Sequence, residues 1–487
     1  MPRTAGRRLG SSVSRLLALS ALVGSTVLGL APGSVRAADD EEAVRVLRSV
    51  QRSLVTLRSV EGESVGIVLR ADGLILTGSF VVASPVPFQV VVEGSGAKAK
   101  PVVFRKVQVV GYHPRYDLAL VRIDPKEQRA PLTPAAVSQA KGNPGQSVYA
   151  VGAGSGPEQG LTVAGGILSA VDREVDGASY YQMDAPVTAA HAGGPLVDRG
   201  GKVLGIVAFT FGELEAVSFA IPLHDVDPAG FVSAANRKAD SGRAQELIAA
   251  AERFSRNSLL AQRMEGRRGA SWFTSTAYAL LAYRMALAAA PGEPAIYYNI
   301  GMFLRSLDVD AAAVPYLVRS IQMMPWARDN GRSYRELGLA LAKQGGGEVA
   351  HAAWREGVTK QPYASQIWED LAIYHLMRRE LHDAMYTSSV ALFIPEQGTR
   401  VNLLNDIRAR VRSVLPGPTL AEIDARTSVD ALRADLGRMV ASSNRARAER
   451  QLYVTRAFRD LVTRLGGPPV AGVEQRIPQD PLPRLER

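Results

Sequence analysis

The pattern of hydrophobic and polar positions changes once along the chain, close to residue 222. On the N-terminal side, short apolar runs such as 64–69, 88–92 and 202–207 are separated by turns that contain Gly, Pro and Asp. Many short strands joined by regular turns are typical of β-barrels and β-sandwiches. We therefore predict an all-β domain over residues 44–222.

Beyond residue 222 the pattern becomes helical. A polar stretch at 223–245, which contains Pro and Ser-Gly, indicates a linker. From there on Ala, Leu and Arg dominate and the apolar positions recur with a helical period. This predicts helical repeats with a capping helix over 246–415 and further helices over 416–465. Residues 466–487 are rich in Pro and poor in apolar side chains, which predicts a disordered tail.

Small and aromatic residues recur in the helical part at intervals of 37 and 34 residues, from Gly301 to Gly338 and from there to Ala372. Small residues let paired helices approach closely, and Pro ends the second helix of each pair. This pattern resembles tetratricopeptide (TPR) repeats, which implies an all-α solenoid that binds peptides or helices in a concave groove. A spacer between domains is the alternative role. Residues 246–264 and 285–291 look like a degenerate earlier copy. The signature positions are Tyr297, Gly301, Ala313, Pro325, Tyr334, Gly338, Ala350, Trp354, Pro362, Trp368, Ala372 and Ala384.

Three segments of the β-rich part resemble, in chain order, the trypsin-like serine proteases of the HtrA type. The first reads Thr-Gly-Ser-Phe-Val and places Phe80 where that family has its general-base His. The second, His-Pro-Arg-Tyr-Asp-Leu-Ala-Leu-Val, places Asp117 at the position of the triad Asp. The third, Ala-His-Ala-Gly-Gly-Pro-Leu-Val, places Ala192 at the position of the nucleophilic Ser. The resemblance implies a trypsin-like double β-barrel.

The chemistry of the triad depends on the residues at these positions. It needs a hydroxyl nucleophile, an imidazole that takes its proton, and a carboxylate that orients the imidazole. Ala192 has no hydroxyl and Phe80 has no basic nitrogen, so only Asp117 of the three is retained. In the oxyanion turn Ala190 replaces a Gly of the family, although Gly193 is kept. We therefore predict a trypsin-like fold without an intact catalytic triad.

The remaining polar groups near these positions have structural interpretations. Asp117 is expected to bond backbone N–H groups or hydroxyls near Phe80, because a buried carboxylate without partners is costly. His191 is expected to be a surface loop residue, and no second ligand at a recognisable spacing accompanies it, so we predict no metal site. No cofactor is expected either. A cleft made apolar by Phe80 and Ala192 suggests binding of an extended peptide without cleavage.

The chain start and the charge bear on location and partners. Residues 1–37 have a basic start, an apolar stretch that is short for a membrane span, and Val35-Arg36-Ala37 at the end, which indicates a cleaved export signal. The formal net charge is +10, but it falls to +5 without this segment, which removes the main support for nucleic-acid binding. Without cysteine, disulfides and thiolate sites are excluded.

Together these features predict an exported, non-catalytic scaffold or adaptor of the bacterial envelope, periplasmic or extracellular, with protein or peptide partners. One alternative is an active serine endopeptidase with a displaced catalytic constellation. Another is a chaperone-like holdase. A helical stripe near 454–465 with arginines beside it favours packing on the array over binding to anionic lipid. The sequence does not define the oligomeric state.

Overall fold

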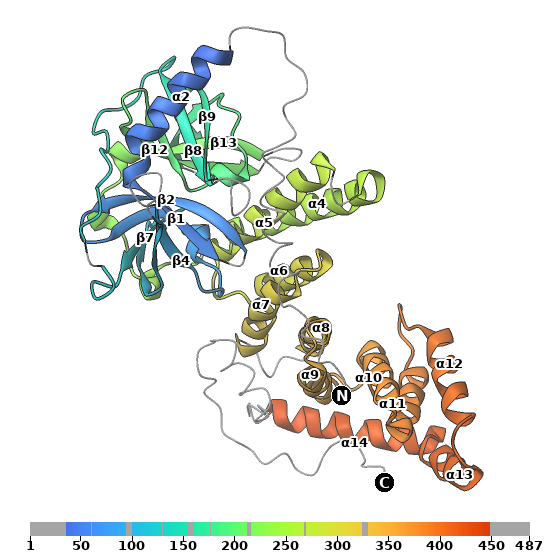
Figure 1. Ribbon diagram of the computed structural model, residues 1–487. Helices are drawn as coiled ribbons and strands as arrows, with labels where there is room; N and C mark the ends of the chain where they lie inside the picture. Colours follow the sequence, from blue (N-terminus) through green and yellow to red (C-terminus); the bar gives the residue numbers. More distant parts are fainter. Residues whose placement is uncertain are drawn as a thin grey trace, which may run out of the picture. The chain divides into compact units, whose positions relative to one another are not determined.

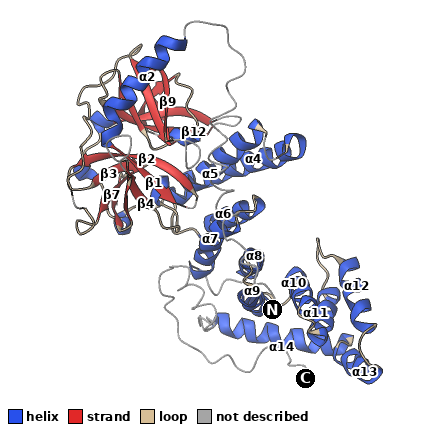
Figure 2. Cartoon of the chain, in the orientation of Figure 1, coloured by secondary structure: helices blue, strands red, loops and turns tan. Residues whose placement is uncertain are grey.

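The computed structural model describes residues 36–59, 61–93, 100–128, 130–153, 160–175, 177–211, 216–266, 269–323 and 330–448. The chain divides into two compact units, Met1–Ile296 and Tyr297–Arg487. Strands occur in the first unit, and the second is helical throughout its described residues (Figure 2). The predicted order of an all-β region followed by an all-α region is thus confirmed. The predicted export signal up to residue 35, the basic stripe near 454–465 and the predicted tail lie outside the described residues.

The first sheet of the β region is a curved half-barrel in which every strand pairs antiparallel with its neighbours. Among the described residues its strand order is β5-β4-β1-β2-β3-β7-β6. β2 and β3 join through a turn in which Gly73 has a φ of +82°, a value that L side chains rarely adopt. The strands are β1 (Leu54–Ser59), β2 (Gly62–Arg70), β3 (Leu74–Gly78), β4 (Gln89–Val92), β5 (Val102–Phe104), β6 (Val107–Tyr112) and β7 (Leu118–Ile123).

The second sheet is a closed barrel, of which β8, β9, β12 and β13 are labelled in Figure 1. Its strand order is β10-β13-β12-β11-β8-β9. Its strands are rich in Val, Ile and aromatic residues, which suit a pleated and partly buried surface. Of the two barrels implied by the resemblance, therefore, the second is closed and the first is an open sheet with β5 and β6 at its edges. The strands are β8 (Ser147–Ala153), β9 (Leu161–Val175), β10 (Ala178–Met183), β11 (Pro195–Asp198), β12 (Val203–Phe211) and β13 (Ala216–Pro222).

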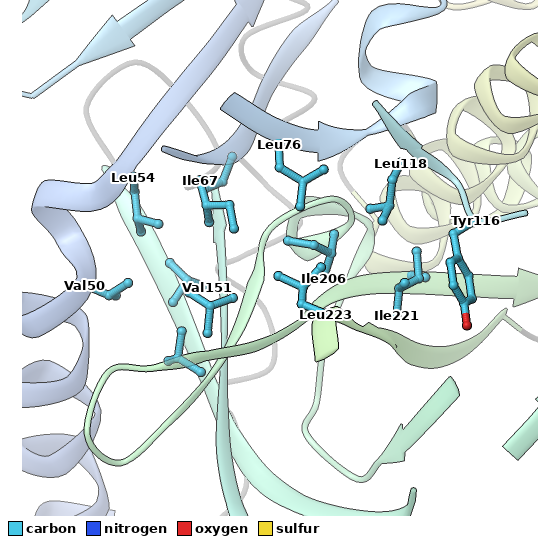
Figure 3. Close-up of a cluster of buried hydrophobic side chains, with 14 of the residues drawn as sticks. Val50, Leu54, Ile67, Leu76, Tyr116, Leu118, Val151, Ile206, Ile221 and Leu223 are labelled. Carbon is cyan, nitrogen blue, oxygen red and sulfur yellow. The ribbon is translucent and has the colours of Figure 1, made fainter. Parts of the chain in front are cut away.

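A shared hydrophobic core joins the two sheets. Side chains such as Leu54, Ile67 and Leu76 of the first sheet face Val151 and Ile206 of the second (Figure 3). The helix α2 (Arg36–Val50) adds buried side chains to the same core. Because both sheets contribute, burial of apolar area holds them in one fixed arrangement.

Short helical turns and a helical hairpin make up the rest of the described part of the first unit. The turn α3 (Ser79–Val82) follows β3, and the 3-10 turn η2 (Ala189–His191) lies ahead of β11. Three more 3-10 turns fill the predicted linker, where Val232 pairs with Tyr112 of β6. Further elements are η1 (Gln51–Ser53), η3 (Leu223–Asp225), η4 (Pro228–Gly230), η5 (Ala234–Asn236), α4 (Ser241–Glu265) and α5 (Ala270–Ala289).

The hairpin formed by α4 and α5 belongs to the first unit and packs on the second barrel. Phe209 and Phe211 of β12 contact Phe254 of α4 and Tyr278 of α5, with ring centroids 5.7 to 6.3 Å apart. These are the distances of favourable edge-to-face and tilted aromatic pairs. The segments that look like a degenerate repeat in the sequence therefore form a pair of helices attached to the barrel.

The second unit stacks helices in sequential antiparallel pairs, as in a TPR-like array. Ion pairs join alternate helices: Arg305 of α6 binds Glu336 of α8, and Arg335 of α8 binds Asp370 of α10. α14 lies against α9 and α11, where the Tyr386 hydroxyl donates to Asp435. The helices are α6 (Pro294–Ser306), α7 (Asp310–Met323), α8 (Asn330–Lys343), α9 (Gly347–Lys360), α10 (Ser365–Met377), α11 (Leu381–Phe393), α12 (Val401–Arg412), α13 (Gly417–Arg426) and α14 (Val429–Ala448).

Glycines among the signature positions lie where paired helices are in close contact. A β-carbon at Gly301 would lie 2.7 Å from Leu317, and one at Gly338 would overlap the Trp354 indole, so glycine lets each helix pair close. The described aromatic and alanine positions are buried. Pro325 lies outside the described residues. Within the described ranges, no helix combines the length and the apolar character that crossing a membrane requires.

Candidate functional site

The three positions that correspond to the triad of the resembled family lie close together and are buried. Phe80 is on α3, Asp117 precedes β7, and Ala192 follows η2; their exposed fractions are 5%, 8% and 2%. The Ser79 amide donates to the Asp117 carbonyl at 2.9 Å, which fixes the first two segments side by side. A β-carbon at Gly193 would lie 3.3 Å from Phe80 Cζ, so the nucleophile loop reaches the ring of Phe80.

The Phe80 ring occupies the centre of this arrangement. It lies against Gly78 and Gly193, and a β-carbon on either residue would crowd the ring. Gly193 has a φ of +78°, a conformation that is strained for any residue with a side chain. Two glycines therefore make room for a benzyl group beside the nucleophile position.

The turn before Ala192 directs its amides at the chain's own carbonyls. Ala189–His191 form a 3-10 turn in which the Ala192 amide donates to the Ala189 carbonyl at 3.2 Å. The Gly193 amide donates to Val207 at 2.8 Å. An oxyanion hole requires amides aimed at the position where a substrate oxygen develops charge. With Ala192 at the nucleophile position, the amides of such a hole would be those of Ala190 and Ala192, and the Ala192 amide is instead bonded to the Ala189 carbonyl.

Asp117 binds a cation that comes from far along the chain. Arg243 Nη2, in the first turn of α4, donates to Asp117 Oδ2 at 2.6 Å, and both side chains are largely shielded from water. Arg237 lies nearby; burial lowers the pKa of its guanidinium, while the charge of Asp117 opposes that shift. The expectation that Asp117 is satisfied is met. Its partner is a guanidinium, however, and not the predicted N–H groups or hydroxyls of the Phe80 region.

The hairpin covers the same three segments. α5 packs against both α3 and η2, and Arg284 Nη2 of α5 donates to the Val81 carbonyl at 3.2 Å. Ser79, which flanks Phe80, has no exposed surface. With the Phe80 ring inside and α5 outside, the described residues argue against the open peptide-binding cleft that the sequence suggested.

His191 is buried, which makes the prediction of a surface loop residue wrong. Its exposed fraction is 7%, and its Nδ1 accepts a hydrogen bond from the Thr188 amide at 3.1 Å as part of a capping box. Burial lowers the pKa of the imidazole to about 4. A β-carbon at Gly152 would lie 2.9 Å from His191 Cδ2, so this glycine makes room for the ring. His191 is a neutral, structural side chain.

Comparison with known proteins finds proteins similar to the β region. Residues 65–206 match the family model "Trypsin-like peptidase domain". The chain is 34% identical over 173 residues to the "Probable periplasmic serine endoprotease DegP-like" of Pseudomonas fluorescens, covering 34% of each protein. It is 30% identical over 174 residues to the "Magnetosome formation protease MamE" of Paramagnetospirillum magneticum, covering 34% of this chain and 23% of MamE.

A solved structure, "Crystal structure of Deg5", is similar at 28% identity with a TM-score of 0.32, over 39% of this chain and 92% of that one. The aligned region spans about a third or less of the curated relatives. The chain therefore contains a trypsin-like peptidase domain with DegP-like and MamE relatives, followed by helices that fit a TPR-like array.

Proposed function

We propose that this chain is an exported, non-catalytic relative of the trypsin-like peptidases, which acts as a protein-binding scaffold in the bacterial envelope. The observation that carries the proposal is the replacement of the base and the nucleophile by Phe80 and Ala192. Loss of either group alone lowers kcat by about 10⁶-fold in a comparable triad enzyme. With both groups replaced, the remaining Asp117 has no imidazole to orient.

The surroundings of the site support the same conclusion. Asp117 is engaged by Arg243, and the Ala192 amide is engaged by the Ala189 carbonyl. The hairpin lies on the two turns that carry Phe80 and Ala192. A displaced constellation would need an accessible hydroxyl, but the neighbouring Ser79 is fully buried. The domain would then serve as a rigid base to which the hairpin is fastened.

The binding role is assigned to the helical array. Solenoids of stacked helix pairs present extended surfaces that suit protein segments. The names of the relatives describe proteases, which act on proteins, and the DegP-like one is described as periplasmic. An exported location and protein partners for this chain are proposed from that likeness and from the predicted export signal.

A fluorophosphonate probe, which labels active serine hydrolases, tests the proposal that the trypsin-like domain is not catalytic. The purified full-length chain is incubated with the probe beside an active DegP-like protease, and casein hydrolysis is measured in parallel. We expect no covalent adduct and no hydrolysis by this chain. An adduct on a serine of this chain, with casein hydrolysis that disappears when that serine is changed to alanine, would overturn the proposal.

Crosslinking tests the proposed role of the helical array in binding proteins. A photoreactive amino acid is placed in the native envelope at exposed positions of the array, Tyr363 and Met377, and at Val110 on the first sheet as the control. We expect a specific protein adduct from the array positions. Adducts confined to Val110, or the absence of any adduct, would contradict a scaffold role of the array.

A further inference from the structure

The turn between α10 and α11 gathers side chains that are typical metal ligands. His375 lies in the last turn of α10, Glu380 immediately precedes α11, and Asp383 is in the first turn of α11. One potential ligand atom from each lies within 4.8 Å of the other two. Ligand atoms bound to one tetrahedral zinc ion at about 2.0–2.2 Å are separated by about 3.3–3.6 Å. His375 Nδ1 and Glu380 Oε2 already lie 2.7 Å apart, and side-chain shifts of about 1 Å would bring all three ligand atoms into this range.

The backbone is shaped to bring these groups together. Arg379 has a φ of 62°, in the left-handed region, and the Glu380 amide donates to the His375 carbonyl at 2.9 Å. His375 is 5% exposed, and its Nδ1 lies 2.7 Å from Glu380 Oε2. The other carboxylate oxygen of Glu380 accepts from Arg378 Nε at 3.3 Å, which holds the carboxylate in orientation.

A second imidazole, from the preceding repeat, lies next to His375, although it is outside the group of three whose ligand atoms are within 4.8 Å of one another. His351 of α9 stacks on Tyr374, and its ring centroid lies 5.0 Å from that of His375. Two imidazoles bound to one tetrahedral ion at about 2.0–2.1 Å have their ring centroids about 5 Å apart. The Nε2 atom of His351 is buried and has no hydrogen-bond partner among the described residues. A buried nitrogen without a partner is costly, and a ligand would satisfy it.

A purely structural role accounts for only part of this arrangement. Acidic residues at the start of α11 complement the helix dipole, and the His375–Glu380 contact closes the turn. Neither explains the unpartnered Nε2 of His351.

We propose that His375, Glu380 and Asp383, with His351 as the fourth ligand, bind a first-row divalent transition metal such as Zn²⁺. Two carboxylates balance the charge of the ion, while two imidazoles favour Zn²⁺ over Ca²⁺ or Mg²⁺, which prefer oxygen ligands. The sequence alone predicts no metal site. The metal would tie α9, α10 and α11 together, so it stabilises two consecutive repeats. This inference does not depend on the inactivity of the peptidase domain.

Titration calorimetry with ZnCl₂ on the chelator-treated full-length chain tests the site. We expect one saturable site that Asp383→Asn and Glu380→Gln each weaken by about tenfold or more, and that His351→Gln weakens as well. His382→Ala is the matched control, because it removes a neighbouring imidazole that is not part of the cluster, and it should bind zinc as the unchanged chain does. Zinc binding with unaltered affinity and stoichiometry in both carboxylate variants would overturn the proposal.

Cobalt provides a readout that needs no variant. Co²⁺ added to the chelator-treated chain should give the strong visible absorption of a tetrahedral site with nitrogen and oxygen ligands, and equimolar Zn²⁺ should remove it. Saturating Zn²⁺ should also raise the Tm of the array by about 5 °C. Absence of the absorption band, together with an unchanged Tm, would contradict the site even if a variant failed to fold.

Discussion

Two regions of the molecule differ in their polar side chains: the trypsin-like centre, formed by Phe80, Asp117 and Ala192, and the turn between α10 and α11. At the centre the family's imidazole and hydroxyl positions hold a phenyl ring and a methyl group, and the surrounding amides are satisfied by the chain itself. At the turn, the imidazole of His375 and two carboxylates converge, and the neighbouring His351 has a buried nitrogen without a partner in the described structure. The first region has become part of a core. The second is the proposed metal site, where titratable groups lie together.

The comparison also shows where family resemblance helps and where it does not. Resemblance leads directly to Phe80, Asp117 and Ala192, whose roles in a protease are defined by their positions. It says nothing of the turn, which belongs to the helical part of the chain. If the centre is part of the core and the turn binds metal, substitutions at the centre should lower the free energy of unfolding. Substitutions at the turn should instead weaken metal binding.

The largest expected effect comes from Phe80→Ala. The ring is 5% exposed and is packed between Gly78 and Gly193, so removing it leaves a cavity in a rigid surrounding. We expect a loss of about 3–5 kcal/mol in the free energy of unfolding, measured by urea denaturation of the first unit's transition. Met264→Ala, at a position 77% exposed, is the control and should change it by less than about 0.5 kcal/mol. A cost below about 1 kcal/mol for Phe80→Ala would mean that the centre is still open.

The Arg243–Asp117 ion pair should give the next largest effect. Arg243→Ala leaves the Asp117 carboxylate largely buried without its guanidinium, and we expect a loss of about 2–3 kcal/mol. The double variant Arg243→Ala with Asp117→Asn should recover part of this loss, because no uncompensated charge remains. If the losses in the free energy of unfolding caused by the two single changes simply added in the double variant, the ion pair would not stabilise the attachment of the hairpin.

His191 should make the first unit sensitive to acid. Its pKa is about 4 when folded, against 6.5 when unfolded, so the unfolded chain binds the proton more readily. The stabilisation is complete above pH 6.5 and is lost as the pH falls toward 4. At pH 5 the free energy of unfolding should be about 2 kcal/mol lower than at pH 7.5 from this group alone. His191→Asn should remove that difference, and an unchanged pH profile in the variant would assign the acid sensitivity elsewhere.

The sequence could reveal the fold and the triad positions because both rest on local patterns. Strand and turn residues mark the barrels, and small residues at repeat spacing mark the helix pairs. It could not reveal Arg243, because the chain is rich in arginine and the pairing joins residues 126 positions apart. His191 was mispredicted because its burial depends on the space left at Gly152, which no local pattern reports. His375, Glu380 and Asp383 were missed because a left-handed turn at Arg379, and not a helical period, brings them together.

The smallest expected effect on stability distinguishes the two regions most sharply. Asp383→Asn in the metal-free chain should change the free energy of unfolding by less than about 0.5 kcal/mol, because the carboxylate is partly exposed and forms no ion pair within the described residues. The same variant should lose the zinc-dependent rise in Tm that the unchanged chain shows. Phe80→Ala, by contrast, should lower the stability of the first unit and leave the zinc-dependent rise intact. If Asp383→Asn destabilised the metal-free array by several kcal/mol, Asp383 would stabilise the fold itself, as Phe80 does at the trypsin-like centre. The two regions would then no longer differ in whether their residues serve stability or metal binding.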